Sequence, residues 1–262
     1  MKSFFKIIIP VFNCEEYIEK CIMSVENQTF KNFVIIAVND LSTDNTFNIV
    51  KNLAEKYQNI ICVEADHKVW NGGARNIGIH YNIESKYTLF LDNDDWFDNE
   101  DCLQVLYNTI QRNNQPDCVR LSYKFLMGEN PETVILDQST PQDLVNSVYI
   151  APWTKCVKSE LVVDFPENTL VEDVVQHIAQ CDNIETMAVC PLPINVWNRN
   201  NTKSISLKEN QHFYNSKRIS SVYRNIADLM DLQCRHDYCE QHRLWRISRY
   251  KEKVSKGEED TF

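Results

Sequence analysis

Continuous apolar stretches alternate with amphipathic ones along the first half of the chain. The apolar stretches, which we predict to be strands, are residues 4–12, 33–40, 60–65, 87–91 and 118–126. The amphipathic stretches between them, which we predict to be helices, are residues 15–25, 45–57, 72–80 and 99–112. Apolar strands separated by helices are typical of a parallel sheet covered on both faces. The pattern therefore predicts an α/β fold with a mostly parallel, Rossmann-like central sheet flanked by helices, and we expect Pro10 to end the first strand.

The second half of the chain is less regular. It predicts a strand and turn near residues 133–137, helices near 141–148 and 172–181, an extended segment over 186–197, and helices from residue 208 onward. The two prolines of the extended segment suit an edge strand. Because no repeat or clear linker interrupts the chain, we divide it into one domain over residues 1–206 and a C-terminal helical tail over residues 207–262.

Polar clusters follow the first four predicted strands. They are Asn13, Asn39–Asp40, Asp66–Gly73 and Asp92–Asp95. In open sheets of this kind, ligands bind beyond the carboxyl ends of the strands, which lie at one edge. The sequence therefore predicts a ligand site at that edge, built from these four clusters.

The composition is that of a globular protein, with 43% hydrophobic residues, 24% charged residues and a formal net charge of −10. This negative charge argues against nucleic acid as a partner. Ten cysteines without a CxxC pair favour reduced, mostly buried thiols over a zinc site. The sequence contains no apolar run long enough to span a membrane and no secretory signal, so we expect the protein to be cytoplasmic.

Residues 235–256 depart from this acidic average, because they carry seven Arg or Lys against three acidic residues. Trp245, Ile247 and Tyr250 are interleaved with the basic residues. One interpretation is a solvated helix face. The other is a surface helix that touches anionic lipid, which would make the protein peripheral on the inner face of a membrane.

The stretch LFLDNDDWFDNE is an apolar strand that runs into several carboxylates. Asp92 and Asp94 form a D-x-D arrangement at the strand end, where carboxylates can ligate Mg²⁺ or Mn²⁺. Asp98 and Glu100 suit the start of the next helix, whose dipole favours negative charge, and Asp98 is a candidate cap. Asp95 stays open between supporting the metal and facing solvent.

Three further stretches suit a nucleotide ligand, but each also has an ordinary structural explanation. In NDLSTDNT, Asp40 suits the N3–H of uracil, although such a stretch is often only a turn and helix cap. In NGGARNIG, Gly72 and Gly73 let the backbone approach a ligand closely, and Arg75 in a first helical turn suits a phosphate. The alternative there is a Gly-rich loop with a surface Arg. In LVEDVVQHIA, Glu172–Asp173 is either a functional pair or an acidic helix start.

Two common nucleotide-binding motifs are absent from the sequence. GxGxxG does not follow the first predicted strand, which disfavours a dinucleotide-binding fold, and no GxxxxGK[ST] occurs, which excludes a P-loop NTPase.

The combination of motifs resembles the family 2 glycosyltransferases, which have the nucleotide-sugar-binding GT-A fold. The matching stretches occur in the family's order and spacing over residues 5–205: IIIPVFNCEEYIEKCIMSVENQTF, VNDLSTDNT, NGGARNIGI, LFLDNDDWF and VEDVVQHIA. The chain departs from the family where Asn39 replaces an acid and Leu41 replaces a glycine. The turn after Asp40 must therefore form without the freedom of glycine at positive φ.

The resemblance implies roles for individual residues on the donor side. The residues that would line the pocket for uridine and diphosphate are Pro10, Phe12, Asp40, Gly72 and Arg75. Two residues from a loop that is flexible in the family, Arg199 and Lys203, would reach the phosphates.

The resemblance also implies a catalytic centre. Asp92 would lie by the ribose and donor sugar and near the metal, and Asp94 would hold the metal on the diphosphate. Asp173 would be the catalytic base. Glu172 would contact the acceptor or donor sugar, and Trp153 would stack on a sugar face.

We therefore expect a metal-dependent inverting glycosyltransferase (a hexosyl- or N-acetylhexosaminyltransferase) that uses Mn²⁺ or Mg²⁺. The donor would be a UDP-sugar, and the acceptor would be a hydroxyl of a glycan or lipid-linked glycan in surface polysaccharide synthesis, such as capsule or lipopolysaccharide. Two rival classes stay open. One is a metal-dependent phosphohydrolase or nucleotidyltransferase that uses the same carboxylates, and the other is a non-catalytic sugar-nucleotide-binding protein.

Overall fold

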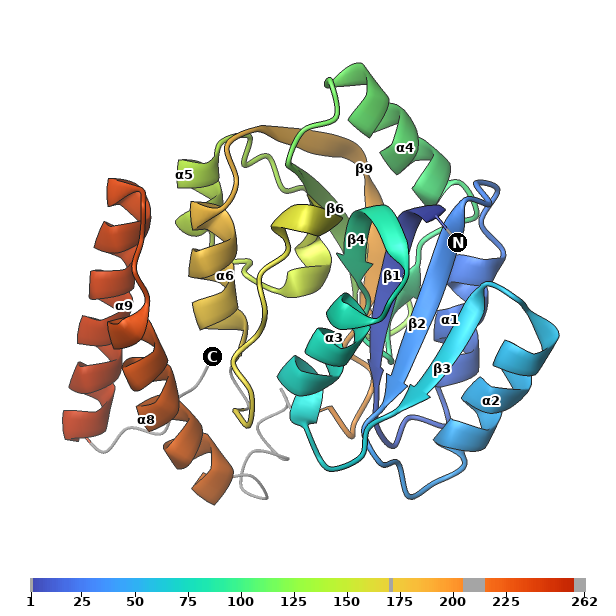
Figure 1. Cartoon of the computed structure of the whole chain (residues 1–262), viewed down its shortest axis with the longest axis horizontal. Helices are drawn as coiled ribbons and strands as arrows, with labels where there is room; N and C mark the ends of the chain where they lie inside the picture. Colours follow the sequence, from blue (N-terminus) through green and yellow to red (C-terminus); the bar gives the residue numbers. More distant parts are fainter. Residues whose placement is uncertain (1, 170–171, 205–214, 257–262) are drawn as a thin grey trace.

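The computed structural model describes residues 2–169, 172–204 and 215–256, and its strands form one sheet in the order β3-β2-β1-β4-β8-β6-β9-β5, with β7 beside β6 (Figure 1). The strands that point in one direction are β1 (Lys2–Val11), β2 (Phe33–Asn39), β3 (Ile60–Glu64), β4 (Glu84–Phe90), β6 (Cys118–Leu126) and β9 (Met187–Asn198). Those that run the other way are β5 (Trp96–Phe97), β7 (Pro131–Val134) and β8 (Lys155–Lys158). The predicted mostly parallel sheet is confirmed.

Helices cover both faces of the sheet (Figure 1). They are α1 (Ile18–Glu26), α2 (Thr46–Lys56), α3 (Trp70–His80), α4 (Cys102–Arg112), α5 (Pro141–Val145) and α6 (Asp173–Asp182), with the short 3₁₀ helices η1 (Pro152–Thr154) and η2 (Ser159–Leu161). Successive side chains of a strand point to opposite faces. In β1, Ile7 and Ile9 pack with residues of α1, α2 and α4, whereas Ile8 packs against α3. Because both faces are buried there, β1 and β2 are mostly apolar along their length, which is the pattern that the sequence showed.

The first strand does not end at Pro10, as we predicted, but continues to Val11. The pairing of β1 with β4 ends at Ile8 and Phe90, whereas its pairing with β2 continues to Val11 and Asn39. The carbonyl of Ile8 points toward β4 and accepts a hydrogen bond from the N–H of Leu91. The backbone nitrogen of Pro10, two residues later, points to the same side. Proline is therefore tolerated, because β4 has ended where its missing N–H would have paired.

The prediction that Asp98 caps the next helix is wrong. Helix α4 begins at Cys102, with Asp101 in the N-cap position. Asp98 instead forms an ion pair with Lys124 of β6, with 2.7 Å between Oδ1 and Nζ. The segment between β4 and α4 holds the short strand β5, which pairs with β9, so the helix starts later than the local sequence indicates. The predicted extended segment over residues 186–197 forms β9, which lies between β6 and β5 and is therefore not the edge strand that we predicted. Within the described residues, β5 pairs with β9 only at Asn195 and Val196.

The C-terminal helices α8 (Asn215–Asp231) and α9 (Asp237–Lys256) pack against α5 and α6. Leu229, Ile247 and Tyr250 are buried in one hydrophobic cluster with residues of α6 and β6. Of the three apolar residues predicted to face lipid, Ile247 and Tyr250 are therefore in the interior, and only Trp245 is exposed. The predicted domain boundary at residues 206 and 207, and the helix start at residue 208, lie outside the described residues.

Basic residues of the tail have acidic neighbours. Arg243 pairs with Glu240, and Arg249 pairs with Glu252. Membrane contact through this helix stays a prediction. No helix within the described ranges has both the length and the apolar character needed to cross a bilayer.

Candidate active site

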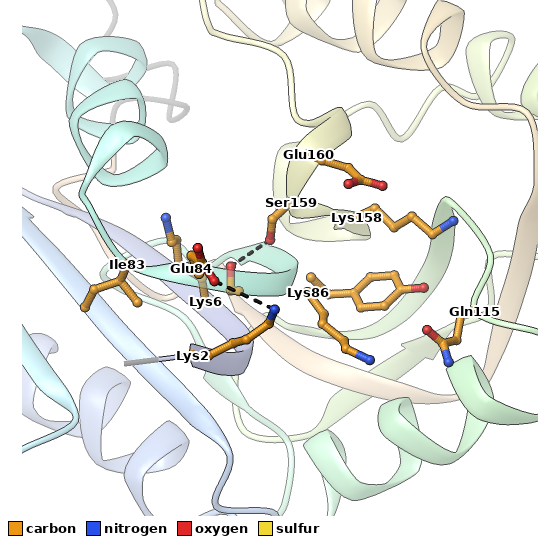
Figure 2. Close-up of a pocket in the computed structure, with 11 residues that line it drawn as sticks. Lys2, Lys6, Ile83, Glu84, Lys86, Gln115, Lys158, Ser159 and Glu160 are labelled. Carbon is orange, nitrogen blue, oxygen red and sulfur yellow. Dashed lines mark hydrogen bonds and ion pairs between the residues drawn. The ribbon is translucent and has the colours of Figure 1, made fainter.

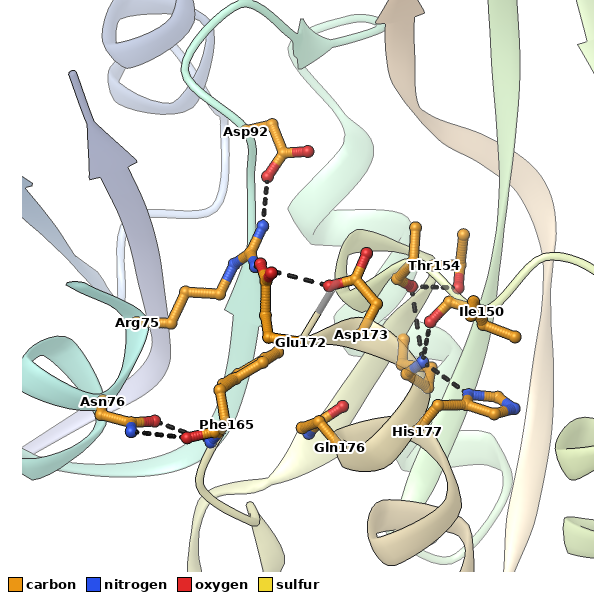
Figure 3. Close-up of polar contacts among 12 residues, drawn as sticks. Arg75, Asn76, Asp92, Ile150, Thr154, Phe165, Glu172, Asp173, Gln176 and His177 are labelled. Atoms are coloured by element: carbon orange, nitrogen blue, oxygen red, sulfur yellow. Dashed lines mark hydrogen bonds and ion pairs between the residues drawn. The ribbon is translucent and has the colours of Figure 1, made fainter. Parts of the chain in front are cut away.

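Arg75 lies at the centre of three carboxylates at the carboxyl edge of the sheet (Figure 3). Its Nη2 donates to Asp92 Oδ1 at 2.8 Å, and its Nη1 donates to Glu172 Oε1 at 2.6 Å. The same Nη1 lies 3.5 Å from Asp173 Oδ1. Arg75 projects from α3, Asp92 follows β4, and Glu172 and Asp173 begin α6. The structure thus brings three separate sequence motifs into one cluster, which we call the arginine-paired group.

The charges of this group perturb one another. Burial alone would lower the pKa of Arg75, but the three carboxylates, Asp92 foremost, outweigh it and raise that pKa. The pKa of Asp173 is raised to about 7, first by burial and then by the neighbouring charge of Glu172, although 34% of the side chain remains exposed. Within the described residues, no hydrogen bond reaches Asp173 Oδ1. A carboxylate with a pKa near neutrality and a partly exposed side chain is suited to take a proton.

Asp94 and Asp95 form a second cluster, which we call the amide-held pair. Asp94 Oδ2 accepts a hydrogen bond from Asn201 Nδ2 at 2.6 Å, and Asp95 Oδ1 accepts from the backbone N–H of Asn198 at 2.8 Å. Burial, with a contribution from Asp92, raises the pKa of Asp94 to about 6. Burial and then the charge of Asp94 raise the pKa of Asp95 well above its usual value. Asp95 is 1% exposed, so the option that it faces solvent is wrong.

The amide-held pair fits a divalent cation whose other ligands come from elsewhere. Within the part of the chain that the structure describes, no group of three or more His, Cys, Asp or Glu side chains could hold a metal alone. Mg²⁺ commonly binds one or two carboxylates and completes its shell with water and substrate phosphates. Asp94 suits this arrangement, because a nearby cation would offset the cost of burying its carboxylate. Asp92 lies beside it, with one oxygen already bound by Arg75.

Asp40 lies in a tight contact with Lys68 and the start of α3. Its Oδ1 accepts from the N–H of Val69 at 2.7 Å, and its Oδ2 accepts from the N–H of Trp70 at 2.9 Å. Lys68 Nζ is 2.8 Å from Asp40 Oδ2 and 3.0 Å from the centroid of the Phe12 ring, a cation–π contact. Because the Asp40 side chain is only 4% exposed and pairs with Lys68, a uracil base would reach its carboxylate only after Lys68 moved.

The neighbouring backbone brings Pro10 to the same edge. The carbonyl of Pro10 accepts from Asn93 Nδ2 at 3.0 Å, which ties the end of β1 to the segment after β4. The turn after Asp40 does use a left-handed conformation, with φ 59° at Leu41. For a residue with a side chain this conformation costs about 1–2 kcal/mol. The absence of glycine therefore strains the backbone at Leu41 but does not displace Asp40.

Two predicted site residues have other surroundings. A Cβ on Gly72 would lie 2.5 Å from the carbonyl oxygen of Pro166, so the close backbone approach there is to the protein's own chain. The Trp153 ring is 6% exposed and packs edge-on against Tyr123, with 4.9 Å between ring centroids, and beside Trp197. A sugar could not stack on this ring while the cluster stays closed, so we assign Trp153 a packing role.

The two predicted phosphate contacts lie near the site on the segment after β9. Arg199 lies over the Trp197 ring, 5.0 Å from its centroid, and it partly offsets the raised pKa of Asp94. Lys203 is exposed and pairs with Glu16 at 2.8 Å. Residues 205 and 206 of the predicted loop lie outside the described residues.

Sequence reasoning missed Lys68 and Asn201. Lys68 precedes the glycines of NGGARNIG by only a few residues, and a cation so close to a candidate nucleotide motif was the available signal. Asn201 lies in WNRNNTKSIS, which contains several asparagines, and the sequence does not indicate which of them would contact a site carboxylate. Its contact with Asp94 spans 107 residues, which no local pattern reports.

A cavity of about 600 Å³ lies at the opposite end of the sheet, and several lysines line it (Figure 2). Lys6 Nζ donates to the carbonyls of Ile79 and Tyr81 at the end of α3, where a cation complements the helix dipole. Lys158 pairs with Asp117 at 2.8 Å. These lysines have structural partners, and we therefore place the candidate site at the carboxyl edge.

Known proteins resemble this chain in sequence and in fold. The chain is 30% identical over 172 residues to glycosyltransferase GlyA of Streptococcus pneumoniae, an alignment that covers 59% of the chain and 24% of GlyA. It is 34% identical over 145 residues to a poly(ribitol-phosphate) beta-glucosyltransferase of Bacillus spizizenii, covering 54% of the chain and 22% of that enzyme. The chain thus spans about a quarter of the length of these curated relatives.

The fold matches a solved structure over nearly its whole length. Residues 1–349 of Staphylococcus aureus TarS, crystallised with UDP, superpose with a TM-score of 0.68 at 20% identity, covering 97% of this chain and 72% of that one. The sequence profile described as glycosyl transferase family 2 matches residues 6–139, half of the 262-residue chain. The predicted fold and family are both confirmed: the chain belongs to glycosyl transferase family 2 and has the GT-A fold.

Proposed function

We propose that this protein is a metal-dependent inverting glycosyltransferase that moves a sugar from a UDP-sugar to a hydroxyl group of a glycan acceptor. The observation that carries the proposal is the carboxylate of Asp173. It has a pKa of about 7, a side chain that is 34% exposed, and Arg75 Nη1 at 3.5 Å from its Oδ1. These are the properties of a general base that works near neutral pH.

In the proposed reaction, Asp173 takes the proton of the acceptor hydroxyl as its oxygen attacks the anomeric carbon from the face opposite the leaving UDP. The bond from the anomeric carbon to the diphosphate breaks, and the configuration inverts. The logic parallels that of an inverting glycosidase, with a sugar hydroxyl in place of water. Glu172, beside Asp173, keeps the pKa of the base raised and is the proposed contact to a sugar.

On the donor side, Asp94 with Asp92 would hold Mn²⁺ or Mg²⁺, and such a cation supplies Lewis-acid stabilisation of the leaving diphosphate. Phe12, Pro10 and Asp40 are the proposed wall of the uridine pocket, which Lys68 covers in the present arrangement. Use of UDP is supported by the fold's likeness to a structure that holds UDP.

The proposed acceptor is a glycan or lipid-linked glycan of a surface polysaccharide, and the proposed location is the cytoplasm, at the inner face of the membrane. The Bacillus spizizenii relative, a poly(ribitol-phosphate) beta-glucosyltransferase, is one example of such chemistry. Since this chain spans only part of that relative, its own donor sugar and acceptor are open to a direct assay.

The test is release of UDP from a panel of UDP-sugars, with Mn²⁺ or with EDTA, combined with the mass of the product. We expect UDP release with one sugar, a glycosylated acceptor, and loss of activity with EDTA. Release of phosphate or pyrophosphate would instead indicate the phosphohydrolase or nucleotidyltransferase alternative. Binding of UDP-sugars without any turnover would indicate the non-catalytic alternative.

A further inference from the structure

Lys155 carries a buried positive charge that acts on the charge of the proposed base, Asp173. It is the first residue of β8 and is 2% exposed. Its Nζ donates to the carbonyl of Ile150 at 2.8 Å, lies 3.4 Å from the carbonyl of Ala151, and is 3.1 Å from Nδ1 of His177. All three of these acceptors are neutral groups.

A buried ammonium held only by neutral acceptors is costly, since removing a charge from water costs several kcal/mol even after the protein relaxes. Burial lowers the pKa of Lys155 to about 8, and the group is still mostly protonated at neutral pH. An apolar side chain would fill this position with a smaller desolvation penalty. We therefore expect the charge of Lys155 and its hydrogen bonds to have a role beyond packing.

His177 connects this charge to the helix that carries the base. It lies one turn after Asp173 in α6, on the same side of the helix. Burial lowers the pKa of His177 well below its usual value, so the ring is neutral. The ring then accepts from Lys155 at Nδ1 and donates from Nε2–H to the carbonyl of Leu144 at 3.0 Å. Both ring nitrogens are bound, which fixes the orientation of the ring.

The strand side of this contact is also held firmly. Arg120 of β6 donates from Nη1 to Thr154 Oγ1 at 2.6 Å and from Nη2 to the carbonyl of Tyr149 at 2.7 Å. Thr154 immediately precedes Lys155, and Tyr149 precedes Ile150. The segment that Lys155 binds is therefore anchored to the sheet, and a displacement of α6 would have to break the contact with His177.

We infer that Lys155 is a positioning residue for Asp173: through His177 it fixes the first turn of α6 against β8, and its charge faces the carboxylate that accepts the proton. This inference rests on the proposed function, because it assigns a task to Lys155 only if Asp173 is the base. The charged groups that face Asp173 are Glu172, Arg75, Asp92 and Lys155. Arg75 contacts Asp173 from the donor side, whereas Lys155 lies on the side of β8.

The contact predicts an effect on turnover and not on donor binding. None of the acceptors of Lys155 belongs to the proposed donor pocket. A shift of the base by about 1 Å can cost on the order of 100-fold in rate, so a loosened α6 should lower kcat and leave the KM for the UDP-sugar unchanged.

Two substitutions of His177 test this with matched shapes. His177→Gln can still place a donor near the Leu144 carbonyl but removes the acceptor for Lys155. His177→Asn keeps an acceptor at the position of Nδ1 but loses the donor to Leu144. We expect kcat of H177Q to fall about tenfold or more, and that of H177N to stay within about threefold of the wild type, with UDP affinity by calorimetry unchanged in both.

Gln180→Met is the control for general loosening of α6. Gln180 is buried on the same helix, and its amide contacts Val163 N–H and the Leu161 carbonyl, away from Lys155. We expect Q180M to lower the melting temperature while keeping kcat. Equal kcat in H177Q and H177N, a loss expressed in KM, or a kcat loss in Q180M that matches that of H177Q would each overturn the inference. If the wild type shows no transferase turnover, the proposed function and this inference both fail. If the wild type is active and Asp173→Asn abolishes its activity, the proposed function stands, and the kcat values of H177Q and H177N alone decide the inference.

Discussion

The arginine-paired group and the amide-held pair lie close together at the carboxyl edge of the sheet, but their charge is balanced in different ways. Asp92, Glu172 and Asp173 surround a buried guanidinium that lies 2.6 to 3.5 Å from their oxygens. Asp94 and Asp95 are held by the Asn201 amide and the Asn198 N–H, both neutral. Burial is the largest cause of the raised pKa values of Asp94 and Asp95, and it is also the largest at Asp173, whose pKa Arg75 lowers only in part.

The difference shows which part of the site is complete in the protein itself. A buried carboxylate is costly unless an opposite charge or a metal accompanies it. Arg75 supplies that charge for the first group, which can therefore form without a ligand. Arg75 does not balance the charge of the amide-held pair, and Arg199 lowers its pKa values only in part. This pair is therefore the part of the site that gains most from a divalent cation. Four experiments test this difference between the two clusters.

The largest effect is expected from Arg75→Met, which removes the cation and leaves three carboxylates together. Breaking a buried ion pair by deleting one partner costs about 3–5 kcal/mol, and we expect the free energy of unfolding in urea to fall by that amount. Arg249→Met is the matched control, because its ion pair with Glu252 is exposed and should contribute less than about 1 kcal/mol. Adding Glu172→Gln to Arg75→Met should recover part of the loss. Unchanged stability in the single variant would mean that Arg75 does not balance the group.

The next effect is expected from Asp173→Asn, which keeps the size of the side chain but removes the base. A positioned general base contributes about 10²–10⁴-fold, so UDP release in the presence of acceptor should fall by that factor. UDP affinity should stay near that of the wild type, because Asp173 is not part of the proposed donor pocket. Wild-type turnover in this variant would eliminate Asp173 as the base.

Asp94→Asn tests the amide-held pair. A bound metal supplies several kcal/mol of charge stabilisation, so we expect Mn²⁺ to tighten UDP binding by on the order of 100-fold in the wild type and to have little effect in the variant. Calorimetry of UDP binding with Mn²⁺ and with EDTA measures both. Asp98→Asn is the control from the same segment, because Asp98 pairs with Lys124 and should leave the metal effect intact. Equal metal effects in wild type and Asp94→Asn would contradict the assignment.

The smallest effect concerns pH. Asp173 must be ionised to act as a base, and its pKa is raised to about 7 by burial and by Glu172. The value of kcat/KM, which reports the free enzyme, should therefore fall about tenfold per pH unit below pH 7 and level off above it. Glu172→Gln removes the neighbouring negative charge and should move this limb to lower pH. A wild-type limb near pH 4 would show that Asp173 keeps an ordinary pKa.

Hydrophobic patterning alone predicted much of the fold, because a strand buried on both faces of a sheet appears in the sequence as a continuous apolar run. The strand over residues 118–126 agrees with β6 residue for residue, and β2 and β3 agree within one residue. The carboxyl-edge location of Asp40, Asp92 and Asp94 also followed, since parallel strands end at one edge. Arg75, predicted in the first turn of a helix, lies in the second turn of α3, which begins at Trp70. The errors occurred where a distant partner overrode a local preference, as at Pro10 and Asp98.

What each site side chain contacts was decided only by the tertiary structure. Arg75 and Glu172 are 97 residues apart, and their contact depends on how α3 packs beside the start of α6. The same holds for the contact of Lys68 with Phe12, for the packing around Trp153, and for the contact of Lys155 with His177. Periodicity reports whether a residue is buried, which is a local property of a helix or strand. It does not report which charge lies opposite, because that depends on how elements distant in sequence pack together.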